Sequence, residues 1–593
     1  MNIKTYRLLP MLLALGSVAS FAQNNCTGAL PTGTCLVPNP PVQVWCAGNN
    51  PASTCPGGTS KVGFFTSSPK AGSWTRQFEG LDAKTILNSG AVPRPQPDPV
   101  GGVGPTDASG VGQYLEIAGG LVQAYDRKTG NGILSHSANS GANPQPLTGV
   151  FAPGGKNYCG SGTADAIATY DRIDNVFVLG NVFNPSNQGT YYYCIGVSAA
   201  TGGVPASNLQ GSGGQSDWNV YAYELNVAIP KNASGRYYFP DYTRFGTWSD
   251  GFYVAWDLED PDTNDVNIVG FEVCKLDKAN IIAGLSSNSP VCYTYIPSYV
   301  PTTNASLIHT LLPADFEGSN PIPTNTAGEY FLAQVNPSNP GTNNQCTILP
   351  CTSNVMAFWT WSGITSGAGP TLISTKTPFT PACYTPEHPW NTVCVQQPAG
   401  NYSDSVGDRL MYRLAYRYIT GQYKGEYLAV AHTIQEDANT QRTGIRYYQI
   451  AAGTNPTVVV KGDLTDNNTH LSAYMPSVAM DHNGNLGVTF SVTGKAGVSA
   501  MNYDPSPVFM ALTLGRAGPV ELFLPNSGAS GQDETDTSWG EYVSVSVDPN
   551  DDLTFWAVDE YMAGDQVANC NGQGTSGCTW ATRVYTCKKG SGC

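Results

Sequence analysis

The feature that most constrains the fold is a short unit that recurs along the chain. In each copy an aspartate opens a polar turn, and a strand of alternating β-branched and aromatic residues follows. Copies begin at Asp126, Asp171, Asp250, Asp481 and Asp548. An aspartate side chain accepts hydrogen bonds from the backbone of a turn, and Asn or Gly supplies the residues with positive φ. Each copy therefore predicts a β-hairpin.

The spacing of these hairpins favours a β-propeller. Asp126 and Asp171 are 45 residues apart, and Asp481 and Asp548 are 67 residues apart. Propeller blades of four strands with long insertions have such periods. A pair of β-sandwich domains is also rich in turns and disulfides, and it stays the alternative. We predict an all-β chain that forms a single large β-propeller of roughly six to eight blades, with about seven as the central value.

The N-terminus has the pattern of a secretory signal peptide. Lys4 and Arg7 precede an apolar run over 8–21, and Ala22 ends a small-x-small cleavage site. The run is too short to span a bilayer, so we expect no membrane anchor and a secreted protein, or a periplasmic one. The predicted divisions are a signal peptide (1–22), a Cys- and Pro-rich segment with a linker (23–97), the β-propeller (98–585) and a disulfide-closed C-terminal tail (586–593).

The sixteen cysteines of the chain fall into neighbouring pairs. An even number in an exported chain predicts disulfides rather than free thiols. Zinc sites need Cys-x2-Cys spacing with histidine nearby, and the sequence has neither. The predicted pairs are Cys26 with Cys35, Cys46 with Cys55, Cys159 with Cys194, Cys274 with Cys292, Cys346 with Cys351, Cys383 with Cys394, Cys570 with Cys578, and Cys587 with Cys593.

Charge and motifs exclude several classes of function. With 29 Lys and Arg against 44 Asp and Glu, the net charge is -15, and no basic stripe could neutralise the phosphates of a nucleic acid. The sequence has no Gly-x-Ser-x-Gly elbow, no His-Glu-x-x-His and no phosphate-binding glycine loop. It does have 32 Tyr and 11 Trp. Aromatic faces stack on sugar rings, so we expect an extracellular polysaccharide or surface glycan as the partner.

The candidate catalytic residues are the carboxylates Asp165, Asp241 and Glu541, with Asp559 as a further member of the acidic set. Glycoside hydrolysis needs two carboxylates that flank the scissile bond. A propeller brings residues of different blades to one central face, so their separation in sequence is no obstacle. The alternative is that these carboxylates only satisfy backbone donors at tight turns.

The candidate substrate-binding residues are Arg409, Arg413, Trp539 and Tyr542. Arg409, Arg413 and Arg417 alternate with apolar residues, which predicts one strand face with three guanidiniums. Arginine binds carboxylates in a bidentate manner, so an acidic sugar would fit, although a solvated or salt-bridged face is the alternative. We expect Arg409 and Trp539 to approach Asp165, Asp241 and Glu541 at a central face, where Trp539 would stack on a sugar.

One acidic loop is a candidate calcium site. Asp257, Asp260, Asp262 and Asn264 crowd a short segment, and Ca²⁺ takes six to eight oxygen ligands from flexible loops of this kind. The alternative is a solvated acidic loop. No other cofactor is indicated by the sequence.

Several long segments resemble a large family of secreted bacterial and fungal propeller-like proteins. They are 165–180 (DAIATYDRIDNVFVLG), 238–258 (YFPDYTRFGTWSDGFYVAWDL), 407–418 (GDRLMYRLAYRY) and 539–561 (WGEYVSVSVDPNDDLTFWAVDEY). The resemblance runs from about residue 98 to 585, and the family is compared with sialidase-type propellers by analogy. It implies a propeller fold and export. The chain departs from the family pattern at Ser538, Glu541 and Leu553, where the family has Arg, Asp and Cys.

Three interpretations of function remain open at the level of sequence. In the first, the propeller recognises an extracellular glycan or cell-surface polymer at its central face. In the second, the same face hydrolyses a glycosidic bond with paired carboxylates, as a sialidase-like propeller. In the third, the chain is an extracellular structural scaffold. Convergence of two or more carboxylates in one place would favour the second.

Overall fold

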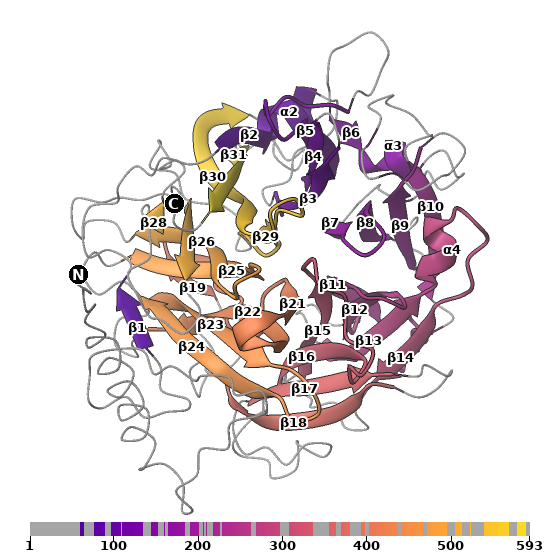
Figure 1. Cartoon of the computed structure of the whole chain (residues 1–593). Helices are drawn as coiled ribbons and strands as arrows, with labels where there is room; N and C mark the ends of the chain where they lie inside the picture. Colours follow the sequence, from indigo (N-terminus) through magenta and orange to yellow (C-terminus); the bar gives the residue numbers. More distant parts are fainter. Residues whose placement is uncertain are drawn as a thin grey trace, which may run out of the picture.

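The computed structural model of the chain describes the residues drawn in colour in Figure 1. They are 60–63, 76–88, 97–107, 110–134, 144–151, 159, 164–183, 190–200, 206, 209, 218–225, 228–262, 268–296, 308–335, 355–362, 369–379, 393–397, 402–436, 442–465, 471–494, 505–512, 522–523, 539–567 and 578–588. The predicted signal peptide lies outside these residues. No helix among them is long and apolar enough to cross a membrane.

Most of the described residues belong to antiparallel sheets that surround a common centre (Figure 1). Five of these sheets have four strands each. The first contains β3 (Val100–Thr106), β4 (Gly112–Ala118), β5 (Leu121–Asp126) and β6 (Gln145–Pro146). The second contains β7 (Ala164–Asp171), β8 (Val176–Phe183), β9 (Tyr192–Ser198) and β10 (Trp218–Glu224). The third contains β11 (Phe239–Thr247), β12 (Phe252–Glu259), β13 (Ile268–Leu276) and β14 (Val291–Tyr295).

The other two four-stranded sheets come from the C-terminal part of the chain. One contains β25 (Leu471–Met480), β26 (Leu486–Gly494), β27 (Ser506–Leu512) and β28 (Leu522–Phe523). The other contains β29 (Ser544–Val547), β30 (Thr554–Val567), β31 (Cys578–Lys588) and β2 (Arg76–Asp82). Between these sheets in sequence lie a two-stranded sheet of β19 (Val393–Gln396) and β20 (Tyr402–Asp404) and the short helices α2 (Ala83–Asn88), α3 (Leu147–Phe151) and η3 (Gly421–Tyr423). The short helix α4 (Lys278–Ile282) lies between β13 and β14 of the third sheet.

The remaining strands form one curled nine-stranded sheet. Its first half is β15 (Ile308–Phe316), β16 (Glu329–Val335), β17 (Val355–Trp361) and β18 (Thr371–Pro378). Its second half is β21 (Leu414–Ile419), β22 (Gly425–Gln435), β23 (Thr443–Ala451), β24 (Thr457–Thr465) and β1 (Ser60–Gly63). The halves join where Ala314–Phe316 pair in parallel with Leu414–Tyr416. If only the separate four-stranded sheets are counted as blades, the described residues form five blades, whereas we expected six to eight.

The first strands of the successive sheets form a closed ring around the centre. β3 contacts β7, and contacts continue through β11, β15, β21, β25 and β29 back to β3. The parallel pairing of β15 with β21 agrees with these strands running in the same direction. A chain that begins each sheet at the centre and proceeds outward has the architecture of a β-propeller. The predicted all-β fold and propeller arrangement are confirmed.

An N-terminal strand closes the ring. β2 pairs with β31 as the outermost strand of a sheet whose other strands come from the C-terminal end of the chain. Phe78 of β2 packs on Tyr125, with ring centroids 5.1 Å apart. β1 likewise pairs with the outer edge of β24. Both strands fall within the segment 23–97 that we had set apart, so the sheets of the propeller extend beyond 98–585.

Four of the five aspartates that we used to predict hairpins hold a turn through backbone N–H groups. Asp126 accepts from Thr129 N at 2.7 Å, Asp171 from Ile173 N at 2.9 Å, and Asp481 from Asn483 N at 2.8 Å. Asp548 accepts from Asn550 N at 2.9 Å. Asp250 differs, because its carboxylate bonds the Tyr253 hydroxyl and the Lys275 ammonium.

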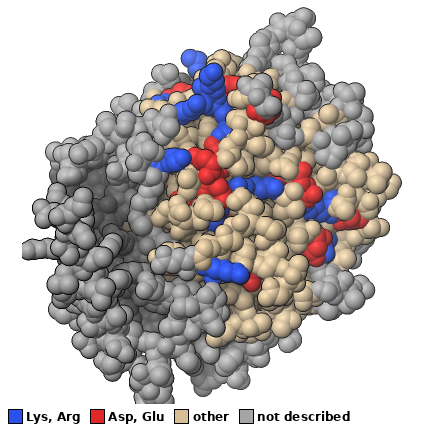
Figure 2. All heavy atoms as spheres, viewed as in Figure 1, with Lys and Arg blue, Asp and Glu red and all other residues tan. Residues whose placement is uncertain are grey.

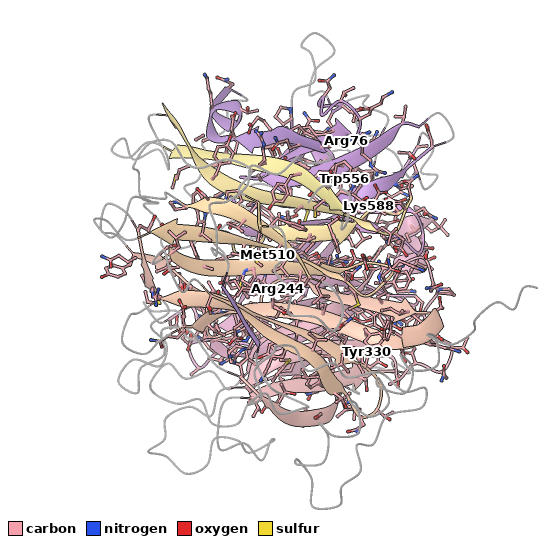
Figure 3. All side chains as sticks on the ribbon, turned by 60° about the vertical axis from the view of Figure 1, so that its left-hand side comes forward. Arg76, Arg244, Tyr330, Met510, Trp556 and Lys588 are labelled. Carbon is pink, nitrogen blue, oxygen red and sulfur yellow. A yellow bond between two sulfur atoms is a disulfide. The ribbon has the colours of Figure 1, made fainter. Side chains whose placement is uncertain are left out.

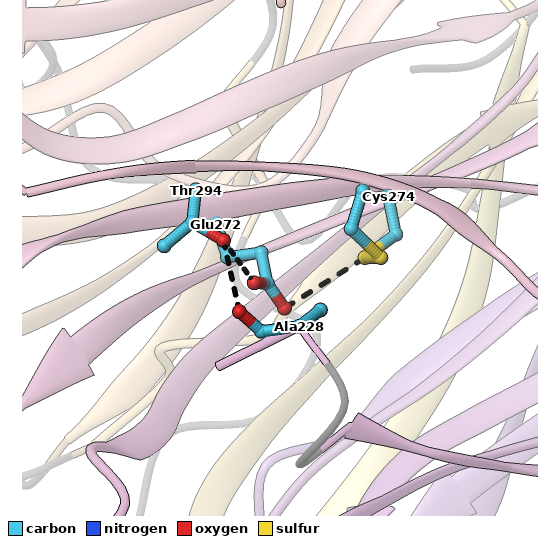
Figure 4. The surroundings of a disulfide bond; sticks show 5 residues. Ala228, Glu272, Cys274 and Thr294 are labelled. Carbon is cyan, nitrogen blue, oxygen red and sulfur yellow. Dashed lines mark hydrogen bonds between the residues drawn. A yellow bond between two sulfur atoms is a disulfide. The ribbon is translucent and has the colours of Figure 1, made fainter. Parts of the chain in front are cut away.

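Two predicted disulfides are present in the described part of the chain. Cys159 bonds Cys194, and Cys274 bonds Cys292 across the β13–β14 pair (Figure 4). These two bridges confirm the pairing of neighbouring cysteines at both places.

The other six predicted pairs each include a cysteine outside the described residues. Cys394 and Cys587 are disulfide-bonded, but their predicted partners, Cys383 and Cys593, lie outside the described residues. Cys570, the predicted partner of Cys578, lies outside them as well. The same holds for both members of three pairs, so these pairings stay predictions: Cys26 with Cys35, Cys46 with Cys55, and Cys346 with Cys351.

Candidate functional site

Six carboxylates gather at the end of the ring where the inner strands begin. We call this group the axial carboxylate cluster, and each member is half-buried. Because the inner strands run in the same direction, the residues near their N-terminal ends meet at one end of the ring. Glu259 reaches the same end because β12 runs antiparallel to β11. The members are Asp98, Asp165, Asp241, Glu259, Asp404 and Glu541.

A β-bulge in β11 joins two sheets at the cluster. The register with β12 shifts between Asp241 and Arg244, which leaves Tyr242 and Thr243 outside the regular ladder. Their N–H groups donate instead to Asp165 Oδ2, at 2.6 Å from Tyr242 N and 3.3 Å from Thr243 N. β7 has a shift of its own between Ala164 and Ile167. The two irregularities place Asp165 beside Asp241.

Three of these carboxyl groups share hydrogen bonds. Asp241 is hydrogen-bonded to both Glu259 and Asp165. Burial and the negative charge of Glu259 raise the pKa of Asp241 to about 7. Burial and the charge of Asp241 raise the pKa of Asp165 to about 7, although Arg244 opposes the shift. Two carboxyl groups form a hydrogen bond only when one holds a proton, so the group keeps protons at neutral pH.

Glu541 joins the cluster from the turn before β29. Burial and the negative charges of Asp98 and Asp165 raise the pKa of Glu541 to about 8. The preceding Gly540 has a φ of 84°, a conformation that residues with a Cβ rarely adopt. A Cβ on Gly540 would lie 3.2 Å from Met475 Cβ. The turn therefore needs glycine to present Glu541 to the cluster.

Two guanidiniums lie beside the cluster, and both pack on the ring of Tyr242. Arg244 Cζ is 3.3 Å from the centroid of Tyr242 and 4.5 Å from that of Tyr542. Arg409 Cζ is 4.5 Å from the centroid of Tyr242, and its guanidinium donates to both oxygens of Asp408, from Nε at 2.8 Å and from Nη2 at 3.3 Å. Arg244 is fully buried and lies toward the middle of the molecule (Figure 3).

The structure brings Asp165, Asp241, Glu541 and Arg409 together, but not in all the roles that we predicted. Trp539 and Tyr542 are both fully buried. Trp539 packs in an apolar cluster that includes Tyr242 and Met475, so its faces are covered by protein. The prediction that Trp539 offers a stacking surface for a sugar is therefore wrong, and Tyr542 has no exposed face for a substrate either.

Arg413 and Arg417 belong to other ion pairs. Arg413 is buried and donates to Asp315 at 2.9 Å and to Glu317 at 2.8 Å. Arg417 is buried against Asp552, with Nη1 to Oδ2 at 2.7 Å. β21 begins only at Leu414, so Arg409 and Arg413 precede the strand. The prediction that the three guanidiniums share one strand face is wrong, because only Arg417 lies in β21. The alternative of salt-bridged arginines is confirmed for Arg413 and Arg417, and Arg413 is not placed to bind a substrate.

The structure gives Asp559 and the residues of the acidic loop different surroundings. Asp559 is buried away from the cluster and accepts from the Thr489 hydroxyl at 2.6 Å. Asp257 is buried in β12, whereas Asp262 pairs with Arg236 at 2.9 Å and Asp260 accepts from Asn232 at 2.8 Å. Asp262 accepts from the same Asn232 nitrogen at 2.6 Å, so Asp260 and Asp262 lie together. Among the described residues Asp257 does not join them as a third ligand, so the predicted calcium site is not formed as expected. Asn264 lies outside the described residues.

Among the described residues, the side chains that lie close enough together to hold a metal ion are a different set, Glu272 with Cys274 and Cys292. Figure 4 shows it: Glu272 accepts from the Thr294 hydroxyl, and Cys274 Sγ lies 3.8 Å from Glu272 Oε1. The two sulfurs are bonded to each other, so in the disulfide form they are not thiolate ligands.

Sequence reasoning missed several members of the site. Glu259 lies in the acidic loop that we considered for calcium, and Arg244 lies in a segment that we assigned to the propeller; neither was expected at the centre. Asp98 is the first residue of the predicted propeller (98–585), directly after the predicted linker, where we named no site residue. A usable signal existed for Asp98, since an aspartate near the start of an inner strand also occurs at Asp165 and Asp241. On the face seen in Figure 2, acidic and basic side chains lie side by side over the central part of the described surface.

Comparison with protein-family models finds no match, and no curated protein sequence matches either. Solved structures that resemble the chain include an alpha-L-arabinanase of Penicillium chrysogenum complexed with arabinobiose (10% identity, TM-score 0.31, 61% of this chain and 96% of that one). Another is the catalytic domain of an alpha-L-arabinofuranosidase of Coprinopsis cinerea (9% identity, TM-score 0.25, 62% and 92%). A third is a polysaccharide lyase (9% identity, TM-score 0.33, 83% and 90%). At these TM-scores, function must be argued from the site itself.

Proposed function

We propose that the protein binds a polysaccharide at the axial carboxylate cluster and cleaves a glycosidic bond there by acid–base catalysis. The observation that carries the proposal is the meeting of Glu541 with Asp165 and Asp241, which come from three different sheets. Glu541, with a pKa of about 8, holds a proton at neutral pH and is the general acid. The hydrogen-bonded pair Asp165 and Asp241 supplies the second carboxylate.

Energetics favour catalysis over binding alone. Each unit by which folding raises the pKa of a carboxyl group corresponds to about 1.4 kcal/mol of interaction free energy. Hydroxyl and amide side chains recognise sugar hydroxyls without that cost. Proton transfer to a leaving group needs a carboxyl group that is protonated and accessible, and the half-exposed cluster keeps several such groups. Enzymes with two catalytic carboxyl groups likewise give them different pKa values. If the protein binds polysaccharides but shows no turnover, it recognises a glycan without cleaving it.

The direct test compares the wild type with Glu541→Gln on a panel of neutral, acidic and amino polysaccharides. Glutamine keeps the shape of the side chain but cannot give up a proton, so turnover falls at least ~100-fold while binding changes little. Release of reducing ends measures cleavage, and retention on the immobilised polymer measures binding. Asp262→Asn, in an exposed ion pair, is the matched control. Equal turnover by Glu541→Gln and the wild type would contradict the assigned role.

Two further proposals concern the molecule as a whole. The nine-stranded sheet acts as two blades, β15–β18 and β21–β24, fused by the short parallel pairing of their inner strands. With the five separate sheets this gives about seven blades, a usual number for propellers.

We also propose that the protein is secreted after cleavage behind Ala22. N-terminal sequencing of exported protein should then begin at Gln23, and retention of residues 1–22 would contradict it.

A further inference from the structure

We propose that the polysaccharide recognised at the axial carboxylate cluster carries free amino groups, as in chains of 2-amino-2-deoxy sugars. This inference rests on the proposed function, and it names the class of substrate that the cluster selects. It follows from which charges a substrate would meet at this end of the ring.

The first observation is the imbalance of charge. The six carboxylates of the cluster are joined by Asp257 and Asp408, whose negative charges act on Arg409. Among the described residues, two guanidiniums accompany these eight acids: Arg244 and Arg409. The acids outnumber the guanidiniums even while some of the acids hold protons, so an anionic sugar would meet net repulsion, and like-charge contact of this kind is how a site rejects a wrong partner.

The second observation is that both cations are withheld from a substrate. Arg409 is bonded through two nitrogens to Asp408, and only 16% of its side chain is exposed. Arg244 is fully buried against the rings of Tyr242 and Tyr542. The six carboxylates of the cluster are half-buried, as Arg409 is, but Arg409 is already held by Asp408. A substrate that reaches the cluster therefore meets oxygen acceptors rather than a free guanidinium.

An ammonium group satisfies such a site better than a hydroxyl. It offers three N–H donors and one positive charge, whereas a hydroxyl offers one donor and no charge. Within the cluster itself, protons separate carboxyl groups that would otherwise repel one another. An ammonium replaces those protons and lets the carboxyl groups ionise, so its charge-assisted hydrogen bonds are stronger than neutral ones.

The third observation concerns Arg244. Its Nη1 donates to Thr243 O at 3.1 Å, but its Nε and Nη2 have no partner among the described residues, although the side chain is fully buried. A buried donor without a partner is costly. The guanidinium faces the fields of Asp165 and Glu541. Because the side chain is fully buried, a sugar does not contact these donors directly, and a water molecule held by a hydroxyl of the bound amino sugar would supply the missing acceptor.

The test measures binding of three hexasaccharides to the full-length protein by calorimetry at one pH and low salt. The probes are a glucosamine hexamer, its fully N-acetylated counterpart and a galacturonate hexamer. The glucosamine hexamer should bind at least ~10-fold more tightly than the acetylated one, which corresponds to about 1.4 kcal/mol, and the galacturonate hexamer should bind most weakly. Binding of the glucosamine hexamer should also weaken with salt.

Variants separate the cluster from the general acidity of the protein. Asp241→Asn and Glu541→Gln should each reduce the preference for the free amine at least ~5-fold, whereas the exposed Asp262→Asn should leave it unchanged. Circular dichroism checks that each variant is folded, and two cluster variants keep the test valid if one of them is not.

Each result separates this inference from the proposed function. If the acetylated hexamer binds as tightly as the glucosamine hexamer, and Asp241→Asn abolishes that binding, the amine preference is wrong but the polysaccharide site is supported. Tightest binding of galacturonate, or amine binding that both cluster variants retain, would also overturn it. If none of the hexamers or polysaccharides binds, the proposed function and the inference both fail.

Discussion

At the scale of single residues, the position of Glu541 depends on the glycine before it. Gly540 has a φ of 84°, and its Cα faces Met475. We predict that Gly540→Ala lowers the free energy of unfolding by about 1–3 kcal/mol, because alanine strains the backbone and crowds Met475. It should also reduce turnover by displacing Glu541. Chemical denaturation and the reducing-end assay measure the two effects.

Gly235→Ala is the matched control for this substitution. Gly235 has nearly the same φ, 85°, but nothing lies within 4 Å of the position of its Cβ. The control therefore carries the backbone cost of about 1 kcal/mol without the contact and without the site. If Gly540→Ala and Gly235→Ala have the same stability and the same turnover, the assigned role of Gly540 is wrong.

The sequence predicted some site residues and missed others for a physical reason. Asp165, Asp241 and Glu541 stand out because each is a carboxylate beside the start of an inner strand. Trp539 shows the limit of that reasoning. The indole ring of Trp539 is suited to stacking on a sugar. Because Gly540 has a positive φ, however, Trp539 packs in an apolar cluster while Glu541 faces the carboxylates. The direction of a turn cannot be obtained from residue types alone.

At the scale of secondary-structure elements, bulges at the beginnings of inner strands decide which side chains reach the centre. Register shifts occur near the N-terminal ends of β7, β11, β15 and β25. A one-residue shift turns every later side chain to the other face. Alternation in the sequence also assumes that one strand spans the whole segment, but β21 begins only at Leu414, after Arg409 and Arg413. The structure instead gives Arg409, Arg413 and Arg417 three separate sets of partners.

Arg413 ties the inner strands together below the cluster. Besides Asp315 and Glu317, its guanidinium donates to Val545 O of β29 at 2.9 Å. We predict that Arg413→Met lowers the free energy of unfolding by about 3–5 kcal/mol, because two buried carboxylates lose their cation. Thermal and chemical unfolding of the purified protein measure the loss.

The comparison variant is Arg236→Met. Arg236 pairs with Asp262 at 2.9 Å, but their side chains are 59% and 36% exposed. Exposed ion pairs contribute about 0–1 kcal/mol, so this substitution should change little. Similar effects of the two substitutions would show that the Arg413 pairs are not what holds the inner strands.

At the scale of the whole molecule, β2 closes the propeller. It hydrogen-bonds β31 along its length, and Glu79 of β2 pairs with Arg583 and accepts from Tyr561 at 2.7 Å. We predict that a chain beginning at residue 83 unfolds at a temperature several degrees lower than a chain beginning at residue 70. The longer chain loses β1 but keeps β2. Equal melting temperatures by calorimetry would refute the closing role of β2.

The sequence predicted the propeller because its hairpins are local. Asp126, Asp171, Asp481 and Asp548 hold their turns through neighbouring N–H groups, so residue types alone reveal them. The fusion of β15 with β21 and the closure by β2 depend on strands far apart in the chain. No local pattern encodes such pairings, and for this reason the N-terminal segment looked separate from the propeller.

The central claim is that carboxyl groups from different sheets form one site that keeps protons at neutral pH. Difference infrared spectroscopy across a pH titration measures it, because protonated carboxyl groups absorb separately from ionised ones. Subtracting the Glu541→Gln titration from that of the wild type isolates Glu541, which should lose its proton near a pKa of about 8. In an Asp165→Asn background a neighbouring negative charge is gone, so the pKa of Glu541 should fall. A Glu541 band that titrates near the ordinary pKa of about 4 in both backgrounds would contradict the account.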